Sequence, residues 1–307
     1  MKARQELESF RTDLGTAVTV GVFDGVHHGH QYLIDRLKDV AQAIGCPSAV
    51  VTFINHPLSV LKPDIELRMI TLPDERISLL KDSGVDFVVP LTFDLEFSYL
   101  TARQFIALLQ DSLNMKALIV GKDFVMGHNR EGTTEVLQKL GEEMGFRLHI
   151  LDPVDDGGAV ISSTLVRNAI SDGDIAKATK LLGRYFSLMG KVIKGDQRGR
   201  QLGFPTANLE VSELILLPPD GVYVTWAEHK GITTMSATSI GIRPTFGLRE
   251  RTIESHLIDF SDNLYGDNLS LNFVSRLREE RKFDTTDELV AQMALDIMNS
   301  RDILGRI

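Results

Sequence analysis

Short apolar, β-branched runs alternate with helix-period segments along the first half of the chain. The first run, at 18–22, is followed by a helical pattern at 31–44 and by a second run at 48–53. This alternation predicts βαβ units, and therefore a parallel sheet that binds ligands at the carboxyl ends of its strands. The other elements predicted in this half are helices at 73–83, 102–113 and 134–144 and strands at 87–90, 117–120 and 147–151.

The pattern changes after a helical stretch at 161–182, which Asp172-Gly-Asp174 divides into two helices. Short strands separated by Gly/Pro turns follow, and they are typical of an antiparallel barrel or sandwich. We therefore expect two domains, 1–182 and 183–307. The strands predicted in the second domain are 186–193, 221–227, 234–240, 252–259 and 268–277, with a closing helix at 286–298.

Composition agrees with two ordinary globular domains. The chain has 307 residues, of which 43% are hydrophobic and 24% charged. Its net charge of −9 argues against broad binding of nucleic acid or anionic membranes. The N-terminus is charged and no long apolar run occurs, so a cytoplasmic location without membrane contact is expected. The single cysteine, Cys46, excludes an internal disulfide and is expected as a small apolar residue near a strand start.

The stretch GVFDGVHHGH, at 21–30, joins the first predicted strand to the first predicted helix. His27 and His30 lie three residues apart at the opening of that helix, where backbone N–H groups and the helix dipole favour an anion. A polyphosphate fits this arrangement, because the intervening glycines let the backbone approach a ligand closely. A helix cap or a metal site is the alternative for the histidines. The candidate phosphate-binding residues here are Gly21, Phe23, Asp24, Gly25 and Gly29.

Three further segments place polar groups where predicted strands end or helices begin. His56 follows the second strand, a glycine-punctuated loop occupies 121–132, and ISSTLVR occupies 161–167. The hydroxyls of Ser162, Ser163 and Thr164 suit a phosphate-binding helix N-terminus, although N-capping alone would also explain them. The guanidinium of Arg167 offers a delocalised cation for transition-state charge.

Together these segments resemble the adenylyltransferase module of prokaryotic bifunctional riboflavin kinase/FAD synthetases. That module usually reads G-x-F-D-G-x-H-x-G-H, F-x-P-H-P, G-x-D-F-x-F-G-x-x-R-x-G and S-S-T-x-x-R. The resemblance implies an α/β nucleotidyltransferase fold in which His27 and His30 contact the triphosphate of ATP and stabilise charge developing on its phosphates. His28, in the variable slot, inherits no role.

The same resemblance implies flavin-binding roles for His56, Asp123 and Arg130 and a catalytic role for Arg167. Two residues depart from the family pattern. Asn55 stands where the family often has proline, and Met126 stands where it often has phenylalanine. Neither change removes a charged or phosphate-binding group, so they bear on flavin affinity more than on the chemistry.

A second glycine-rich stretch, at 190–208, ends in a Pro-Thr-Ala-Asn segment that reads as a turn. It is consistent with a flexible hairpin loop. Glycines with basic residues also form a plausible flap over phosphates, and Thr206 and Asn208 offer the hard oxygen ligands that Mg²⁺ prefers. Magnesium, bound together with ATP, is therefore implied. The candidate phosphate-binding glycines of this stretch are Gly195, Gly199 and Gly203.

This stretch closely resembles the riboflavin kinase signature, and the resemblance extends over nearly all of 183–307. It implies a mainly antiparallel β-barrel in which the threonine of P-T-A-N helps to hold Mg-ATP. Glu254 lies within an apolar strand, where it is either a solvent-facing residue or, as the resemblance favours, the general base. Arg278 falls where relatives contact the flavin, with a surface ion pair as the alternative.

The sequence therefore predicts a two-module enzyme of flavin-cofactor synthesis. Riboflavin and ATP would give FMN in the second module, and FMN and ATP would give FAD and pyrophosphate in the first. A monofunctional adenylyl- or cytidylyltransferase with an inactive barrel is one alternative, and a flavin carrier with decayed catalysis is another. The oligomeric state stays open.

Overall fold

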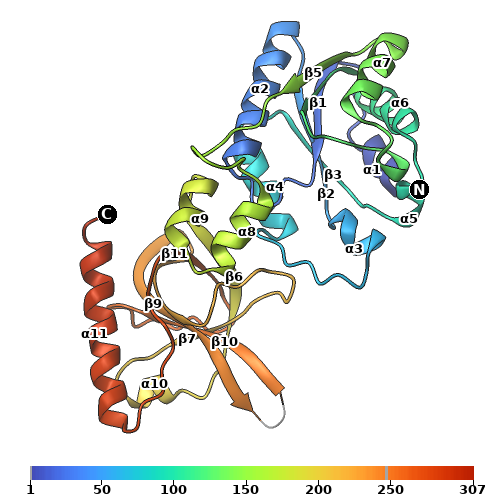
Figure 1. The fold of residues 1–307 in the computed structure, drawn as a ribbon. Coiled ribbons are helices and arrows are strands. Elements are labelled where there is room, and N and C mark those ends of the chain that lie inside the picture. Colours follow the sequence, from blue (N-terminus) through green and yellow to red (C-terminus); the bar gives the residue numbers. More distant parts are fainter. Residues whose placement is uncertain (1, 246–247) are drawn as a thin grey trace. The chain divides into compact units, whose positions relative to one another are not determined.

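The protein is described by a computed structural model, which covers residues 2–245 and 248–307. The chain divides into two compact units, Met1–Ser163 and Thr164–Ile307 (Figure 1). The first unit contains an open sheet with helices, and the second contains a barrel with helices. Each unit is described separately below.

The first unit is built on a five-stranded sheet in the order β3-β2-β1-β4-β5. All neighbouring strands are parallel, so every strand ends at the same edge of the sheet. The strand order reverses between β1 and β4, which makes the carboxyl ends of these two central strands the expected ligand position. The bounds are β1 Thr16–Gly21, β2 Ser48–Phe53, β3 Phe87–Leu91, β4 Met115–Gly121 and β5 Arg147–Leu151.

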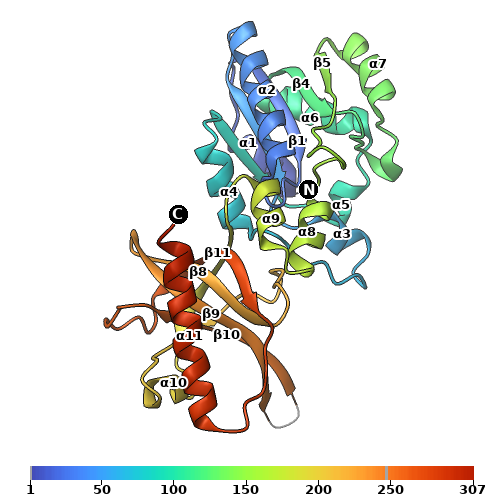
Figure 2. The ribbon, with the colours of Figure 1, turned by 60° about the vertical axis from the view of Figure 1, so that its left-hand side comes forward.

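Alternating side chains of the buried strands form two apolar cores, one on each face of the sheet. Val18 and Val20 of β1 lie in one core, and Ala17 lies in the other. The first core is covered by α1, α6 and α7 and the second by α2 and α4 (Figure 2). The bounds are α1 Lys2–Glu8, α2 His28–Ile44, α4 Pro73–Asp82, α6 Ala102–Leu113 and α7 Thr134–Met144.

Short helical segments lie in the connections that follow β2, β3 and β4, and they were not predicted from the sequence. They are α3 (Pro57–Leu61), α5 (Leu95–Ser98) and the 3₁₀ turn η1 (His128–Arg130). Cys46 lies two residues before β2 and packs, partly buried, against the core under α2 and α4. This agrees with its expected role as a small apolar residue.

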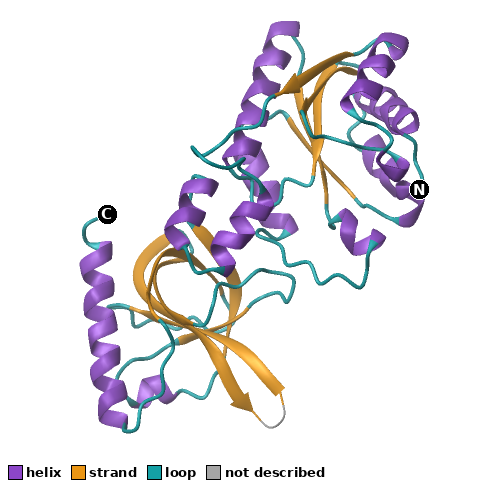
Figure 3. Ribbon diagram, viewed as in Figure 1, coloured by secondary structure: helices purple, strands orange, loops and turns teal. Residues whose placement is uncertain are grey.

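The second unit is a closed antiparallel barrel with the strand order β10-β7-β6-β11-β8-β9 (Figure 3). This confirms the barrel and settles the choice between barrel and sandwich, because β10 pairs with both β7 and β9 and thereby closes the ring. The bounds are β6 Phe186–Ile193, β7 Ala207–Glu210, β8 Gly221–His229, β9 Ile232–Thr245, β10 Leu248–Leu257 and β11 Asn268–Arg278.

Strand β7 corrects one sequence interpretation. The Pro-Thr-Ala-Asn segment was expected to be a turn, but Ala207 and Asn208 begin this strand. The reason is pairing with distant residues: Asn208 lies opposite Glu254 of β10 and opposite Ile193 of β6. Such long-range pairing overrides the local turn propensity of the segment.

Four hydroxyl side chains lie fully buried inside the barrel and hydrogen-bond to one another. Thr225 of β8 lies 2.7 Å, oxygen to oxygen, from both Ser236 and Thr238 of β9. Thr238 donates in turn to Ser255 of β10 at 3.0 Å. All four residues have an exposed fraction of 0%. The hydroxyls therefore satisfy one another across three neighbouring strands, as buried polar groups must.

Three longer helices and one short one accompany the barrel. Helix α9 packs on β6 and β11, and α11 packs along β8 and β9 (Figure 1). Asp172-Gly-Asp174 separates α8 from α9 as the sequence predicts, with Asp174 capping α9. The bounds are α8 Ser163–Ser171, α9 Ile175–Leu182, α10 Arg198–Gln201 and α11 Thr286–Leu304.

Candidate active sites

In the first unit, the carboxyl ends of β1, β4 and β5 open onto a pocket of about 360 Å³. This is the edge of the sheet at which the sequence predicts ligand binding. The pocket wall combines the loop after β1, the start of α2, the loops after β4 and β5, and the segment before α8. The lining residues that the sequence singled out are Gly21, Phe23, His27, Gly29, His30, Asp123, Ser162 and Ser163.

His27 and His30 lie side by side at the N-terminus of α2. Their rings stack with centroids 3.7 Å apart and planes inclined by 18°, and the ring of Phe23 meets that of His30 edge-on at 5.1 Å. His27 is also the N-cap of α2, because its Nδ1 accepts the backbone N–H of His30 at 3.4 Å. Capping uses only Nδ1, so the cap and a phosphate contact do not exclude each other.

His30 lies in surroundings that favour its neutral form. Its Nδ1 is buried and has no hydrogen-bond partner. Burial lowers the pKa of His30 well below 6.5, and positive charge at His27 and Arg76 lowers this pKa further. At neutral pH the imidazole therefore carries one proton, which we assign to Nε2 because a buried N–H without an acceptor is rare.

Asp24 is a structural residue of the loop after β1. Its carboxylate is 1% exposed and accepts the backbone N–H groups of Ile70 and Thr71, each at 3.0 Å. The hydroxyl of Thr71 accepts the N–H of Gly25, whose φ of +82° places it in the left-handed region. Neither Asp24 nor Gly25 lines the pocket. Their predicted phosphate contact stays a prediction, whereas their role in shaping the loop follows from these bonds.

Arg76 is a residue that the sequence interpretation did not single out. It lies on α4 with 1% exposure, and its guanidinium donates to the carbonyls of Phe53 and Ile54 at the end of β2. Its Nε is buried without a hydrogen-bond partner. Burial lowers the pKa of Arg76 and the nearby Asp24 carboxylate raises it. The segment D-E-R, in which Asp74 and Glu75 precede Arg76, resembles an ordinary solvated helix start, so no local signal indicates that Arg76 is buried.

The start of α8 is hydrogen-bonded to the loop after β1. The hydroxyl of Ser163 donates to the backbone carbonyl of Asp24 at 2.9 Å, which brings Ser162 and Ser163 to the pocket wall. Thr164 and Arg167 follow on α8, in the second compact unit. The catalytic role of Arg167 stays a prediction.

Of the three flavin-binding residues predicted in the first module, Asp123 lines the pocket, and His56 and Arg130 do not. His56 caps α3 by accepting the N–H of Leu58 at 3.1 Å. Arg130 is exposed in η1 with a φ of +60°. Neither residue lines the pocket, and the flavin contact of both stays a prediction.

Both departures from the family pattern have structural accounts. Asn55 joins the ends of β2 and β3: its amide donates to the carbonyl of Phe93 at 2.8 Å and accepts the N–H of Phe93 at 3.0 Å. Met126 is 8% exposed in the core covered by α1, α6 and α7. Neither residue lines the pocket, so both act on the scaffold around it.

In the second unit, a pocket of about 570 Å³ opens between the glycine-rich segment and the loop after β10. Thr206 lines this pocket, as do Gln197 and Arg200 from the glycine-rich segment. The opposite wall is formed by residues 260–265, which include Asp262 and Tyr265. A concave site with polar groups on both walls suits a nucleotide.

Thr206 lines this pocket, whereas Asn208 and Glu254 do not line it but lie beside Thr206 on β7 and β10. The hydroxyl of Thr206 donates to the carboxylate of Glu254 at 3.2 Å. Asn208 and Glu254 are directly opposite each other on β7 and β10. Since Ala207 and Ser255 beside them point into the barrel, the alternation of a strand places Asn208 and Glu254 together on its outer face. Glu254 is half-buried there, not fully solvated.

The glycines of this segment allow close approach to the same residues. A Cβ on Gly195 would lie 2.5 Å from the side-chain amide of Asn208. A Cβ on Gly199 would collide with the carbonyl oxygen of Phe204 and lie 3.4 Å from the hydroxyl of Thr206. Gly203 has a φ of +87°, a conformation that glycine adopts most readily. Glycine at 195 and 199 therefore allows the segment to approach Asn208 and Thr206 closely.

The oxygen atoms of Thr206, Asn208 and Glu254 fit a magnesium ion bound mainly through nucleotide phosphates. A hydroxyl and an amide oxygen lie next to a carboxylate, with the amide cradled against Gly195. In residues 2–245 and 248–307 no cluster of three His, Cys, Asp or Glu side chains could hold a metal by itself.

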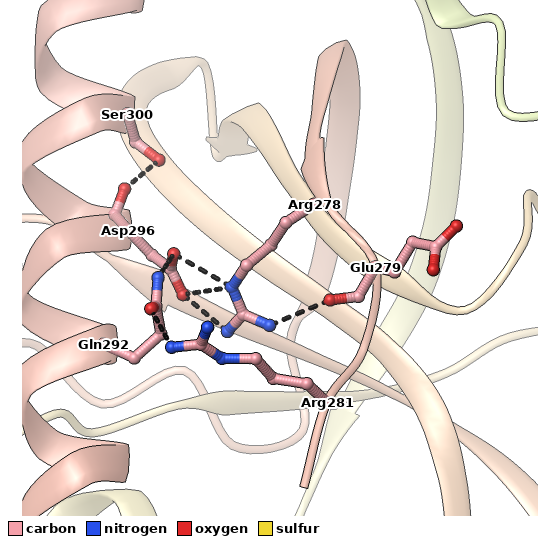
Figure 4. Close-up of polar contacts among 6 residues, drawn as sticks. All are labelled: Arg278, Glu279, Arg281, Gln292, Asp296 and Ser300. Atoms are coloured by element: carbon pink, nitrogen blue, oxygen red, sulfur yellow. Dashed lines mark hydrogen bonds and ion pairs between the residues drawn. The ribbon is translucent and has the colours of Figure 1, made fainter. Parts of the chain in front are cut away.

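Arg278 forms an ion-pair and hydrogen-bond network with side chains of α11 (Figure 4). Its guanidinium donates to the Asp296 carboxylate, with Nη2 at 2.7 Å and Nε at 3.1 Å, and to the carbonyl of Glu279 at 3.0 Å. Gln292 also donates to Asp296 at 2.7 Å, and Arg281 bonds to Gln292. The ion-pair alternative is therefore realised in this structure, and the flavin contact of Arg278 stays a prediction.

Comparison with known proteins assigns a family to each unit. A family model described as FAD synthetase matches residues 10–165, and one described as riboflavin kinase matches residues 182–304. The bifunctional riboflavin kinase/FMN adenylyltransferase of Escherichia coli (strain K12) is 38% identical over 293 residues, which cover 95% of this chain and 93% of that protein. Its counterpart in Bacillus subtilis (strain 168) is 34% identical over 286 residues, covering 92% and 90%.

A solved structure also matches over the whole chain. A crystal structure of a protein named macrolide-efflux protein, from Streptococcus pneumoniae, superposes with a TM-score of 0.89 at 34% identity, covering 98% of this chain and 97% of the other. The described part of the present chain contains no helix that is both long and apolar enough to span a membrane.

Proposed function

Because the chain belongs to the bifunctional riboflavin kinase/FMN adenylyltransferase family, we propose that its two pockets divide two consecutive reactions between them. The protein phosphorylates riboflavin with ATP to give FMN, and it transfers AMP from ATP to FMN to give FAD and pyrophosphate. In our proposal the sheet pocket performs adenylyl transfer and the barrel pocket performs phosphorylation. The observation that supports this division is that each family match contains all the lining residues of one pocket.

Adenylyl transfer needs cations and N–H donors around the triphosphate, because charge develops on the bridging and leaving phosphates as pyrophosphate departs. His27 and His30 stack at the N-terminus of α2, where the backbone N–H groups add to the same positive potential. We assign phosphate contact to these two imidazoles and to the hydroxyls of Ser162 and Ser163. Arg167 is the proposed further cation, and the FMN phosphate is the nucleophile that attacks the α-phosphate of ATP.

Phosphorylation of riboflavin needs a base for the primary alcohol and electrophilic help for the γ-phosphate. Thr206 both lines the barrel pocket and bonds to Glu254, so it lies between the proposed ATP site and the proposed base. Glu254 accepts the proton of the terminal ribityl hydroxyl as the alkoxide oxygen attacks the γ-phosphate, and ADP leaves. Gly195 and Gly199 let the segment that carries them cover the phosphates.

Thr206 and Asn208 would hold magnesium together with the ATP phosphates. When bound there, the ion neutralises phosphate charge and withdraws electron density from the γ-phosphate. The protein's own part is to place the hydroxyl, the amide and the Glu254 carboxylate next to one another. We propose the cytoplasm, where ATP is available, as the enzyme's location, and 182/183 as the boundary between the modules.

A product assay on the full chain tests this proposal. Riboflavin and Mg-ATP should yield FMN and then FAD by chromatography, and supplied FMN should yield FAD without riboflavin. FAD from supplied FMN without any phosphorylation of riboflavin would identify a monofunctional synthetase. Flavin retention without turnover would identify a carrier.

A further inference from the structure

The floor of the barrel pocket consists of side chains that face the barrel interior. Val192 of β6, Ala207 of β7 and Leu257 of β10 line the pocket, and each is at most 8% exposed. Ser255 of β10 lies among them with an exposed fraction of 0%, and its side chain points into the barrel, where it bonds to Thr238. A ligand that reaches this floor therefore meets an apolar surface that carries the hydroxyl group of Ser255.

The direction of the hydrogen bonds among the buried hydroxyls leaves one proton over. Each hydroxyl has one proton to donate, and the geometry makes Thr238 the donor to Ser255 at 3.0 Å. Thr238 therefore accepts the proton of Thr225 at 2.7 Å. Thr225 in turn accepts from Ser236, whose oxygen lies 2.7 Å from the Thr225 hydroxyl and 3.0 Å from the Thr225 carbonyl. Within the described part of the chain, the last proton of this series, that of Ser255, has no acceptor.

The Ser255 proton lies where a bound molecule can accept it. Successive hydrogen bonds polarise one another, so the last O–H group of the series is a stronger donor than an isolated serine hydroxyl. A buried donor without an acceptor is costly, and the pocket is the space that Ser255 borders. An acceptor atom on the ligand of this pocket would remove that cost.

The surroundings of Ser255 suit the base of a nucleotide better than its phosphates. Arg200 and Thr206 line the pocket on the side of the glycine-rich segment, which covers the phosphates in our proposal. The opposite wall carries the carboxylate of Asp262, which repels a polyanion, and the aromatic ring of Tyr265, which can pack against a base. The apolar floor likewise disfavours a charged group. Adenine has ring nitrogens without hydrogen, N1, N3 and N7, and these accept hydrogen bonds.

We propose that Ser255 recognises the adenine base of ATP in the barrel pocket by donating its O–H proton to an unprotonated ring nitrogen of the base. This inference rests on the proposed function, in which the barrel pocket binds ATP for riboflavin phosphorylation. Ser255 contacts the base and not the reacting phosphate, so it governs the affinity for the nucleotide and not the chemical step. A purine that presents C–H or N–H at that position loses the hydrogen bond and leaves the Ser255 donor unpaired.

The test combines variants of the full chain with 1-deaza-, 3-deaza- and 7-deaza-ATP, each of which replaces one ring nitrogen by C–H. Ser255→Ala removes the donor, and Ser255→Cys keeps the size of the side chain with a much weaker donor. Ser236→Ala is the matched control, because it removes an equally buried hydroxyl from the other end of the series, at a residue that does not line the pocket. Thermal unfolding and FAD formation from supplied FMN report on the integrity of each variant.

The decisive readout is the KM for the nucleotide in riboflavin phosphorylation. In the wild type, one of the three analogues should have a KM roughly three- to tenfold above that of ATP, which corresponds to the loss of one neutral hydrogen bond. Ser255→Ala should raise the KM for ATP by a similar factor, with kcat and the KM for riboflavin nearly unchanged, and Ser255→Cys should lie between. In Ser255→Ala that analogue and ATP should have nearly equal KM values, because both lack the bond. Ser236→Ala should resemble the wild type with all four nucleotides.

The inference is overturned if every analogue changes the KM by the same factor in the wild type and in Ser255→Ala. This holds even if the variant is less stable or binds ATP more weakly, because a purely structural serine would give that result. If Ser255→Ala does not fold, the same comparison is made with Ser255→Cys. Failure of the proposed function would look different: the wild type would form no FMN from riboflavin and Mg-ATP, while calorimetric titration with ATP and the analogues would still report whether Ser255 contacts the base.

Discussion

The substitution Glu254→Gln separates the proposed catalytic base from a residue that merely occupies a strand. Glutamine has nearly the same shape, so it keeps the cross-strand position opposite Asn208. Its side-chain oxygen still accepts the hydroxyl of Thr206, which lies 3.2 Å from the glutamate in the native chain. What the variant loses is the charge and the ability to take a proton.

The substitution should change the free energy of unfolding much less than the activation free energy of the reaction. Replacing one charge-assisted hydrogen bond of a half-buried group by a neutral one costs about 1 kcal/mol of folding free energy. Losing a positioned general base lowers the rate by roughly a hundred- to ten-thousandfold, which corresponds to about 3 to 5 kcal/mol of activation free energy. Riboflavin phosphorylation should therefore fall by two to four orders of magnitude, whereas the melting temperature should change by only a few degrees.

The assay measures initial rates of FMN formation from riboflavin and Mg-ATP, and FAD formation from supplied FMN on the same preparation. The control is Glu228→Gln, an exposed glutamate on strand β8 of the same barrel, which should leave both rates unchanged. A normal rate of riboflavin phosphorylation in Glu254→Gln would refute the assignment of the base. Asp259 and Glu279 would then be the carboxylates to consider. The guanidinium of Arg301 donates to Asp259 at 2.7 Å, and this contact lowers the pKa of Asp259.

Three further outcomes are expected. Gly195→Ala should slow riboflavin phosphorylation at least tenfold and spare FAD synthesis, because the added Cβ would displace the amide of Asn208; equal loss of both activities would contradict this. Asn55→Ala removes two hydrogen bonds to the backbone of Phe93 and should lower the free energy of unfolding by about 1 to 3 kcal/mol in urea titrations. Because the folded-state pKa of His30 lies below 6.5, its contribution to stability is complete above that pH and is lost as the pH falls below it. Melting temperatures should therefore decline less between pH 7 and 5 in His30→Gln than in the wild type.

Much of the secondary structure was predictable because local signals agree with the tertiary packing. The helix at 102–113 was predicted to the residue, since its apolar period is strong and Thr101 forms a capping box with Gln104. The strands at 48–53 and 186–193 were also predicted to the residue. Helix α1 was missed because Ala3 and Leu7 are the apolar residues in an otherwise polar segment.

Local spacing alone indicates a shared site only for residues that are neighbours in the sequence. His27 and His30 are three residues apart, so the sequence itself indicates that they face the same way. Arg76 could not be found in this way, because its burial depends on the end of β2, more than twenty residues earlier. The ion pair of Arg278 likewise depends on Asp296, which lies on α11, 18 residues further along the chain.

The buried hydroxyls of the barrel have a consequence for how the barrel assembles. Thr225 is paired with Ser236 across β8 and β9, and Thr238 is paired with Ser255 across β9 and β10. If β9 slipped by one residue, its side chains would exchange faces, and the hydroxyls of Thr225 and Ser255 would lose their partners inside an apolar interior. Each unsatisfied hydroxyl would cost about 1 to 3 kcal/mol, so a misaligned barrel is penalised by several kilocalories before any apolar contact is counted. An interior of purely aliphatic side chains would tolerate such a shift better, so the buried hydroxyls favour the native register of β9 over its shifted alternatives.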